Sequence, residues 1–247
     1  MTEDRAATEV LGYVLVIALV TITIGVVMTF GIGGLEASQQ SEQVNNMERA
    51  FDVLGHNIGQ LTGQEAPSRA TELRLGDGMV GYGSSTVFNV TSGDENITDP
   101  AISTSPLVYS DVSDTTISYE SGGIIRTDGD AARFLQEPSI HADDDTLVLT
   151  IEQLRRHGGT PESLERSGTV LVRKEHLETT INETSTSEDS VNISIGSVQS
   201  DLWKEYLVEQ EIGTVTNESE TVRLEVSAGE FENVVIVSHH IRMTLSE

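Results

Sequence analysis

Six histidines are the residues of this chain best suited to bind a metal or to exchange a proton: His56, His141, His157, His176, His239 and His240. No two of them have the His-x-x-x-His spacing of a helical zinc site, and the chain has no cysteine to complete one. His239 and His240 are neighbours in a segment typical of a strand, so their side chains point to opposite faces. The histidines therefore predict neither a metal site nor another cofactor.

Acidic residues are abundant, but none of their patterns is specific for catalysis. Asp143-Asp144-Asp145, or Asp128 with Asp130, could bind Ca²⁺, yet neither has the ligand spacing of a calcium loop, and a solvated turn is the simpler interpretation. The chain has no Gly-x-Ser-x-Gly elbow, and the glycine-rich stretch Gly76–Gly83 lies between expected strands, where a hairpin explains it. A carboxylate pair for glycoside hydrolysis stays open, because 40 acids offer many pairs and none stands out. We expect a protein that is not an enzyme.

Five Asn-x-Ser/Thr sequons are the remaining candidates for chemistry, here as sites of sugar attachment: Asn89, Asn96, Asn182, Asn192 and Asn217. A chain rich in serine and threonine produces several sequons by chance. Together they fit a glycoprotein whose body lies outside the cell.

Composition limits the partners. The 40 acidic residues face 14 basic ones, only two of them lysines, and the formal charge is −26. Acid-rich, lysine-poor chains of this kind look like proteins of extreme halophiles, in which salt screens the repulsion. An acidic ligand-binding surface is the alternative. Nucleic acid is excluded as an expected partner, because phosphate binding needs a basic face.

One apolar segment near the N-terminus must position everything else. Val10 to Leu35 are 26 consecutive uncharged residues, which as a helix would be about 39 Å long and would cross a ~30 Å hydrocarbon core. A buried core helix, or a secretory signal cut near Gly31-Ile32-Gly33, are the alternatives. Arg5 before the segment weakly favours a cytoplasmic N-terminus, and the sequons favour an outside body. We expect a single-pass membrane protein at the cell surface.

The helix is expected to continue to about Gln60 and to end at the Thr62-Gly63 signal. Gly31, Gly33 and Gly34 would make a flexible break within it. After this break, apolar residues recur at spacings of 3, 4, 3, 4 and 3 and define one face, called the seam: Val44, Met47, Phe51, Leu54, Ile58 and Leu61. The seam would pack on the body of the protein, or it would form a coiled-coil stalk between two chains.

From Arg69 onward, short period-two segments separated by turn signals predict an antiparallel, β-rich head at 63–247, so that the whole is α+β. A helix is expected at Leu202–Gln210, a weaker one at Thr160–Arg166, and a looser region at Asn182–Asp189. The expected strands are Thr71–Leu75, Thr86–Thr91, Thr115–Glu120, Ile124–Thr127, Thr146–Ile151, Thr169–Arg173, Val191–Ile195, Thr221–Val226 and Val234–Leu245.

Residues 4–16, with the sequence DRAATEVLGYVLV, resemble the start of archaeal, and particularly haloarchaeal, type IV pilin-like precursors with a class III signal peptide. The resemblance implies that a prepilin-type peptidase cuts after Ala6, that Ala7 becomes the first residue, and that the helix is retained. It also implies an assembly role for Glu9, whose carboxylate would meet the amine of a neighbouring subunit. Glu9 would be third in the mature chain rather than fifth, as it is in bacterial pilins, and a hydrated carboxylate in the headgroup layer is the alternative.

The expected organisation is a leader at 1–6, a transmembrane helix at 7–35, its amphipathic continuation at 36–62 and the external head at 63–247. The first function to consider is a pilin-like structural subunit, whose partners are lipid, the peptidase, the pilus assembly machinery and other pilin-like subunits. The alternative is a signal-anchored surface protein whose head binds a ligand or partner without polymerising. An anchored enzyme, the third class, has no site to support it.

Overall fold

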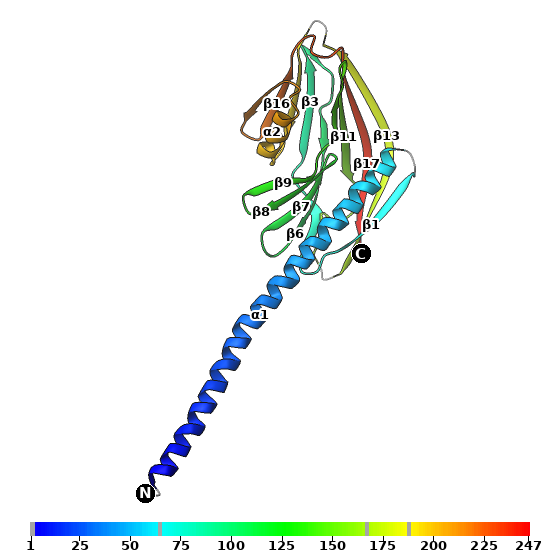
Figure 1. Ribbon diagram of the computed structural model, residues 1–247. Helices are drawn as coiled ribbons and strands as arrows, with labels where there is room; N and C mark the ends of the chain where they lie inside the picture. The colour runs from blue at the N-terminus through cyan, green and yellow to red at the C-terminus, as the bar shows by residue number, and fades with distance from the viewer. Residues whose placement is uncertain (1–2, 64–65, 166–167, 187–188) are drawn as a thin grey trace. The chain divides into compact units, whose positions relative to one another are not determined.

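The computed structural model describes residues 3–63, 66–165, 168–186 and 189–247. It contains an N-terminal apolar helix and a β-rich head, so the fold class is α+β (Figure 1). Helix α1 runs from Glu3 to Thr62. The chain divides into two compact units, Met1–Asn46 and Met47–Glu247, so α1 contributes to both. This boundary lies within the segment 36–62 that the sequence presents as one amphipathic piece.

The helical backbone of α1 continues through Gly31–Gly34, where the sequence predicts a break. Each glycine costs a helix only about 1 kcal/mol. In a helix of 60 residues the backbone hydrogen bonds on either side keep the register, so the prediction of a break is wrong for the secondary structure.

Three sheets make up the head. Sheet A has the order β1-β13-β17-β11-β10, sheet B the order β12-β2-β6-β7-β8-β9, and sheet C the order β15-β16-β14-β3-β4, with β5 paired to β3. All neighbours are antiparallel except β11 and β17, which are parallel. The strands of sheet A are β1 (Ser68–Arg74), β10 (Ile140–Ala142), β11 (Thr146–Arg156), β13 (Thr169–Ser185) and β17 (Asn233–Ser246). Those of sheet B are β2 (Met79–Tyr82), β6 (Leu107–Ser110), β7 (Thr115–Glu120), β8 (Gly123–Asp128), β9 (Ala131–Gln136) and β12 (Ser163–Glu165). Those of sheet C are β3 (Thr86–Ser92), β4 (Glu95–Asn96), β5 (Ile102–Thr104), β14 (Val191–Gly196), β15 (Thr214–Glu218) and β16 (Thr221–Val226).

One core lies between sheets A and C, and helix α2 (Ser200–Glu209) closes it. Trp203, the only tryptophan, packs edge-on against Phe88 and Phe134, each with ring centroids 5.8 Å apart. Because aromatic edges and faces carry opposite partial charge, this arrangement is favourable beyond the area that it buries. Trp203 therefore links the helix to two sheets.

Strand β17 contributes side chains to two cores, one on each of its faces. Val234 and Ile236 are buried in the core with sheet C, whereas Ile241, Met243 and Leu245 are buried on the opposite face of the same strand. Successive residues of a strand alternate between faces, so an even-to-odd change of buried positions means a change of face. Sheet A therefore contributes to two cores, one on each of its faces.

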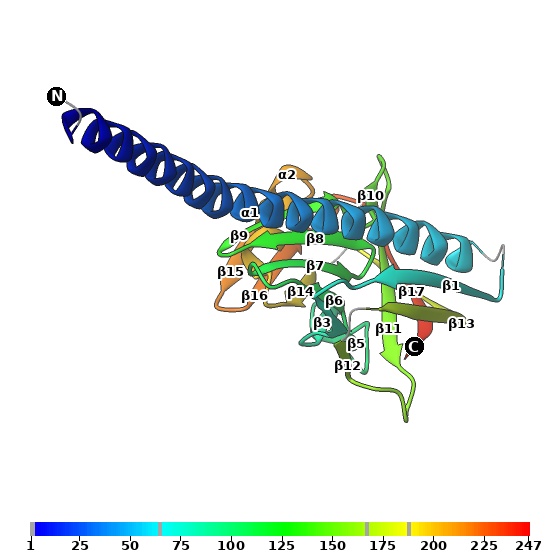
Figure 2. The ribbon, with the colours of Figure 1, turned by 90° about the horizontal axis from the view of Figure 1, so that it is seen from below.

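The second core lies beneath the end of α1, which extends over strands of sheets A and B (Figure 2). A side chain at Gly55 would contact Tyr119 of β7, Ile124 of β8 and Gln136 of β9 at 3.3–3.4 Å. Asn57 donates a hydrogen bond of 2.9 Å to Thr71 of β1. The helix therefore rests on both sheets and closes the core between them.

Two predicted elements differ from the structure. Ser163–Glu165, within the segment expected to be a helix, is strand β12 and pairs with β2; Arg166 lies outside the described residues. The looser region expected from Asn182 begins as strand, because β13 continues to Ser185 along β17. In both places, pairing with a strand distant in sequence prevails over local propensity.

Truncating the seam should destabilise the head far more than truncating the exposed side of the same helix. Phe51 is 0 % exposed and Val53 is 51 % exposed. We expect Phe51→Ala to lower the free energy of unfolding by about 3–5 kcal/mol, since it leaves a cavity. Val53→Ala, the matched control, should change it by less than about 0.5 kcal/mol. Urea unfolding of the full chain in detergent, followed by Trp203 fluorescence, measures both; equal effects would contradict the placement of the seam.

Candidate functional site

The N-terminal unit exposes a large apolar surface. Among the described residues, one helix is long and apolar enough to cross a membrane, at Val10–Thr29, with a mean hydropathy of 2.7. Its large apolar side chains, fourteen from Val10 to Met28, are 49–73 % exposed. At about 1.5–3 kcal/mol for each such side chain, covering them is worth on the order of 20 kcal/mol.

Polar groups within this segment are satisfied by the helix itself. The hydroxyls of Thr21, Thr23 and Thr29 each donate a 2.8 Å hydrogen bond to the carbonyl four residues earlier. An unpaired hydroxyl in hydrocarbon costs several kcal/mol, and this internal bond removes the cost. The 20 residues extend about 30 Å, which matches a hydrocarbon core.

The predicted processing and assembly residues lie in the first turns of α1. Ala6, Ala7 and Glu9 are helical in backbone, and their side chains lie outside the part of the chain that the structure describes. The cut after Ala6 and the pairing of Glu9 therefore stay predictions.

Five of the six seam residues face the interior of the head. Met47, Phe51, Leu54, Ile58 and Leu61 are all at most 1 % exposed within the second unit. Val44 falls in the N-terminal unit and is 5 % exposed. Side chains that fill the core of one chain cannot also pair two chains, so the seam serves the head rather than a dimeric stalk.

A buried lysine lies under α1, and the partner of its ammonium group is a hydroxyl. Lys174 of β13 is 0 % exposed, and its Nζ donates a 2.6 Å hydrogen bond to Thr71 Oγ1, which also accepts from Asn57. Burial lowers the pKa of Lys174 to about 7. At the other side of the helix, Glu48 pairs with Arg126 of β8 at 2.6 Å. Polar contacts thus fix the helix on both sheets.

Two buried carboxylates, Glu120 and Glu152, are each bound by neutral donors. Glu120 of β7 accepts hydrogen bonds from Trp203 Nε1 at 2.7 Å and from Ser197 Oγ at 2.8 Å. Glu152 of β11 accepts one from the hydroxyl of Tyr119, and its burial raises its pKa to about 7. Burial and the neighbouring Glu152 also raise the pKa of Tyr119. The pattern of each strand alone does not identify this network, because every donor comes from a distant part of the chain.

One carboxylate in each of the acidic turns weighed for Ca²⁺ is bound by its own chain. Asp143 Oδ1 accepts the backbone N–H groups of Asp145 and Thr146 at 3.0 and 2.8 Å. Asp128 accepts from Arg126 and from Thr115. Within the described residues no cluster of three potential ligands could hold a metal ion.

His239 and His240 lie on opposite faces of sheet A. His239 Nδ1 lies 2.9 Å from Thr179 Oγ1, which also lies 3.0 Å from His176 Nε2. His240 lies 3.5 Å from Thr180 Oγ1 and lines a cleft on the other face. Burial lowers the pKa of both His239 and His240, so neutral rings prevail at neutral pH.

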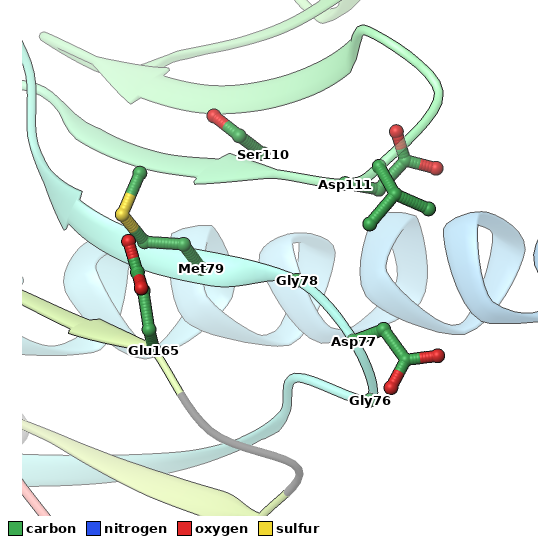
Figure 3. A pocket seen from close by; sticks show the side chains of 8 residues that line it. Gly76, Asp77, Gly78, Met79, Ser110, Asp111 and Glu165 are labelled. Carbon is green, nitrogen blue, oxygen red and sulfur yellow. The ribbon is translucent and has the colours of Figure 1, made fainter.

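A shallow depression of about 440 Å³ lies beside the β1–β2 turn. Figure 3 shows its acidic residues, with Asp77 and Asp111 on turns and Glu165 beside Met79. Asp111 accepts hydrogen bonds from Ser113 and Thr115 of its own turn. The three carboxylates of the depression do not point to a common position, so the depression defines no binding chemistry.

The five sequon asparagines differ in the exposure and the hydrogen bonds of their side-chain amide groups. Asn96 is exposed on the two-residue edge strand β4. Asn182 Nδ2 donates a 2.9 Å hydrogen bond to Ile97 O, and Asn217 Nδ2 donates a 2.8 Å hydrogen bond to Asp201 Oδ1. Asn89 and Asn192 are half-buried in the paired strands β3 and β14.

Fold and helix together define a class of protein: a β-rich head built on the end of a helix whose beginning is apolar and exposed. The chain belongs to the Family of unknown function (DUF7289), whose model matches residues 5–244. The match includes the apolar segment, so that segment is part of what defines the family. No curated protein and no solved structure matches the chain.

The raised pKa of Glu152 predicts a pH-dependent stability. The unfolded carboxyl titrates near 4.5 and the folded one near 7, so between these values only the folded state keeps the proton. Stability therefore falls as pH rises through this window, by about 3 kcal/mol at ~1.4 kcal/mol per pKa unit. We expect Glu152→Gln to remove this decline in urea unfolding of the full chain.

Burial of Lys174 makes stability change with pH in the opposite direction and over a different pH range. It therefore serves as the internal comparison. Its pKa falls from 10.5 in the unfolded chain to about 7, so stability rises with pH between these values. Lys174→Met should flatten that rise and leave the window from 4.5 to 7 unchanged. A wild-type curve that is flat in both windows would contradict both assignments.

Sugar attachment should follow the accessibility of the amide. Glycopeptide mass spectrometry of protein purified from its native membrane should find sugar on Asn96 and none on Asn182 or Asn217. Asn96→Gln should then lower the mass of the intact chain, whereas Asn182→Gln should leave it unchanged apart from the substitution. A glycan on Asn182 of the folded protein is the result that would overturn this prediction.

Proposed function

We propose that this protein is a membrane-anchored, pilin-like structural subunit of the cell surface that assembles through its N-terminal helix. The observation that carries the proposal is the exposed apolar segment Val10–Thr29 at the beginning of a helix whose end completes the core of the head. Covering the exposed surface is worth on the order of 20 kcal/mol, which exceeds the ~5–15 kcal/mol that a domain normally gains on folding. A surface of this energy must be covered. Lipid covers it before assembly, and helices of neighbouring subunits cover it afterwards.

Three features support this function over an ordinary removable signal. The family match begins at residue 5 and includes the helix. The threonine hydroxyls within the segment are bonded internally, as a lasting stay in hydrocarbon requires. The sequence around Ala6 resembles a cut that precedes the helix and keeps it.

The acidic head fits an environment rich in salt. With 33 acidic and 12 basic residues at positions 63–247, the head repels itself, and screening within a few ångströms of each charge relieves the repulsion. The external placement of the head rests on the sequons and on the single apolar helix. No catalytic role is part of the proposal.

The mass of the mature N-terminal peptide tests the proposal most directly. We expect protein from the native membrane to begin at Ala7. A chain that begins at Met1 or Thr2 would instead be a simple signal anchor, and a chain that begins beyond residue 33 would have lost the segment altogether.

Assembly itself is tested by a pair of charge-neutralising variants. Glu9→Gln removes the carboxylate expected to pair with the amine of a neighbour, whereas Glu3→Gln changes a residue of the leader. We expect Glu9→Gln to reduce the protein recovered in sheared surface filaments at least fivefold, with Glu3→Gln at the wild-type level. Equal recovery of both variants would contradict the assembly role of Glu9.

A further inference from the structure

A roofed cleft of about 190 Å³ lies on the face of sheet A that also borders sheet C. Its floor is polar and comes from three adjacent strands: β13 supplies Thr180, β17 supplies Ser238 and His240, and β11 supplies Gln153. Thr180 is opposite Ser238, and Gln153 is opposite His240, so all four side chains share one face.

Residues 98–102, from the loop after β4 and the first residue of β5, form the roof of the cleft, and side chains of the floor bind the chain on both sides of it. Asn182 Nδ2 donates a 2.9 Å hydrogen bond to Ile97 O, just before the loop. Gln153 Nε2 donates a 2.7 Å hydrogen bond to Ser103 O, just after it. The cleft is therefore preorganised, since its roof is fixed without a ligand.

Two buried polar atoms of the floor have no hydrogen-bond partner among the described residues. Gln153 Oε1 and Ser238 Oγ belong to side chains that are each 2 % exposed, and neither atom makes a hydrogen bond within the described chain. Both residues line the cleft. A buried polar atom without a partner is costly, so these two atoms point to a guest that supplies hydrogen bonds.

The floor also defines the chemistry of that guest. Gln153 Oε1 only accepts, so it needs a donor, whereas Ser238 Oγ accepts or donates. Arg155 and Asp99 line the cleft with opposite charges, which favours neither a cation nor an anion. Pro100, Ala101 and Ile102 add apolar surface from the roof.

We propose that this cleft binds one neutral sugar residue, whose hydroxyls pair with Gln153 and Ser238 and whose C–H face rests against the roof. Hydroxyls both donate and accept, so a sugar satisfies the acceptor and the serine at the same time. The site makes the head a carbohydrate-binding surface, and it is independent of whether the protein polymerises. Ordered water, at ~30 Å³ per molecule, is the competing occupant.

The experiment is a titration of the full chain in phospholipid nanodiscs, which avoids detergents with sugar headgroups. The probes are the methyl glycosides of glucose, galactose, mannose and N-acetylglucosamine, followed by saturation-transfer NMR. At least one should bind with a Kd of about 1 mM, the range open to a ligand of about a dozen heavy atoms.

Two variants and one control connect the binding to the cleft. Ser238→Ala removes the unpartnered hydroxyl and should weaken binding at least tenfold. Ala101→Trp enlarges an exposed roof residue and should also weaken binding. Because Ala101 is exposed, this variant does not disturb a core. The matched control is Ser121→Ala, which removes another buried, unpartnered hydroxyl, in the β7–β8 turn, and should bind as the wild type does.

Each other outcome overturns the proposal. No saturable binding by any of the four glycosides at about 50 mM means that the cleft holds water only. Wild-type binding by both cleft variants places the sugar elsewhere. Tighter binding of glucuronate than of glucose shows that the site selects an anion.

Discussion

The packing of one helical face against two sheets is the interaction on which the rest of this structure depends. Sheets A and B each have an apolar side that must be covered, and the end of α1 covers both, with Phe51 and Leu54 fully buried. The same helix begins as an exposed apolar segment. Because the helix that begins with this segment also supplies Phe51 and Leu54, the head cannot complete its core without the end of α1.

Sheet A connects this core to the one that contains Trp203. Its long strands change their buried face along their length, and β13 carries a register shift between His176 and Glu178 near the change. Buried polar groups lie at the same junction: Glu152 on β11 and Lys174 on β13. Each costs stability, and each has a hydrogen-bond partner from another strand that only one arrangement of the sheets provides.

Periodicity in the sequence was sufficient where burial alone decides the structure. All nine expected strands are present, and Thr115–Glu120 and Thr221–Val226 have the expected bounds. Short strands such as β2 and β9 were missed because pairing, rather than an apolar pattern, creates them. The roofed cleft was also missed: Gln153 and Ser238 are 85 positions apart and meet only through the parallel pairing of β11 with β17. Ala6, Ala7 and Glu9 were selected by resemblance, and they remain predictions.

The imbalance of charge explains how this head buries carboxylates at all. With 40 acidic residues and 14 basic ones, most carboxylates have no cation available to them, and Arg126 already serves both Glu48 and Asp128. Inside the head, neutral donors take the place of cations: an indole and a serine hydroxyl bind Glu120, and a tyrosine hydroxyl binds Glu152. Such donors keep their strength when salt screens the surface, because buried contacts are screened far less than exposed ones. The buried contacts of the head are therefore less sensitive to salt than the charges at its surface.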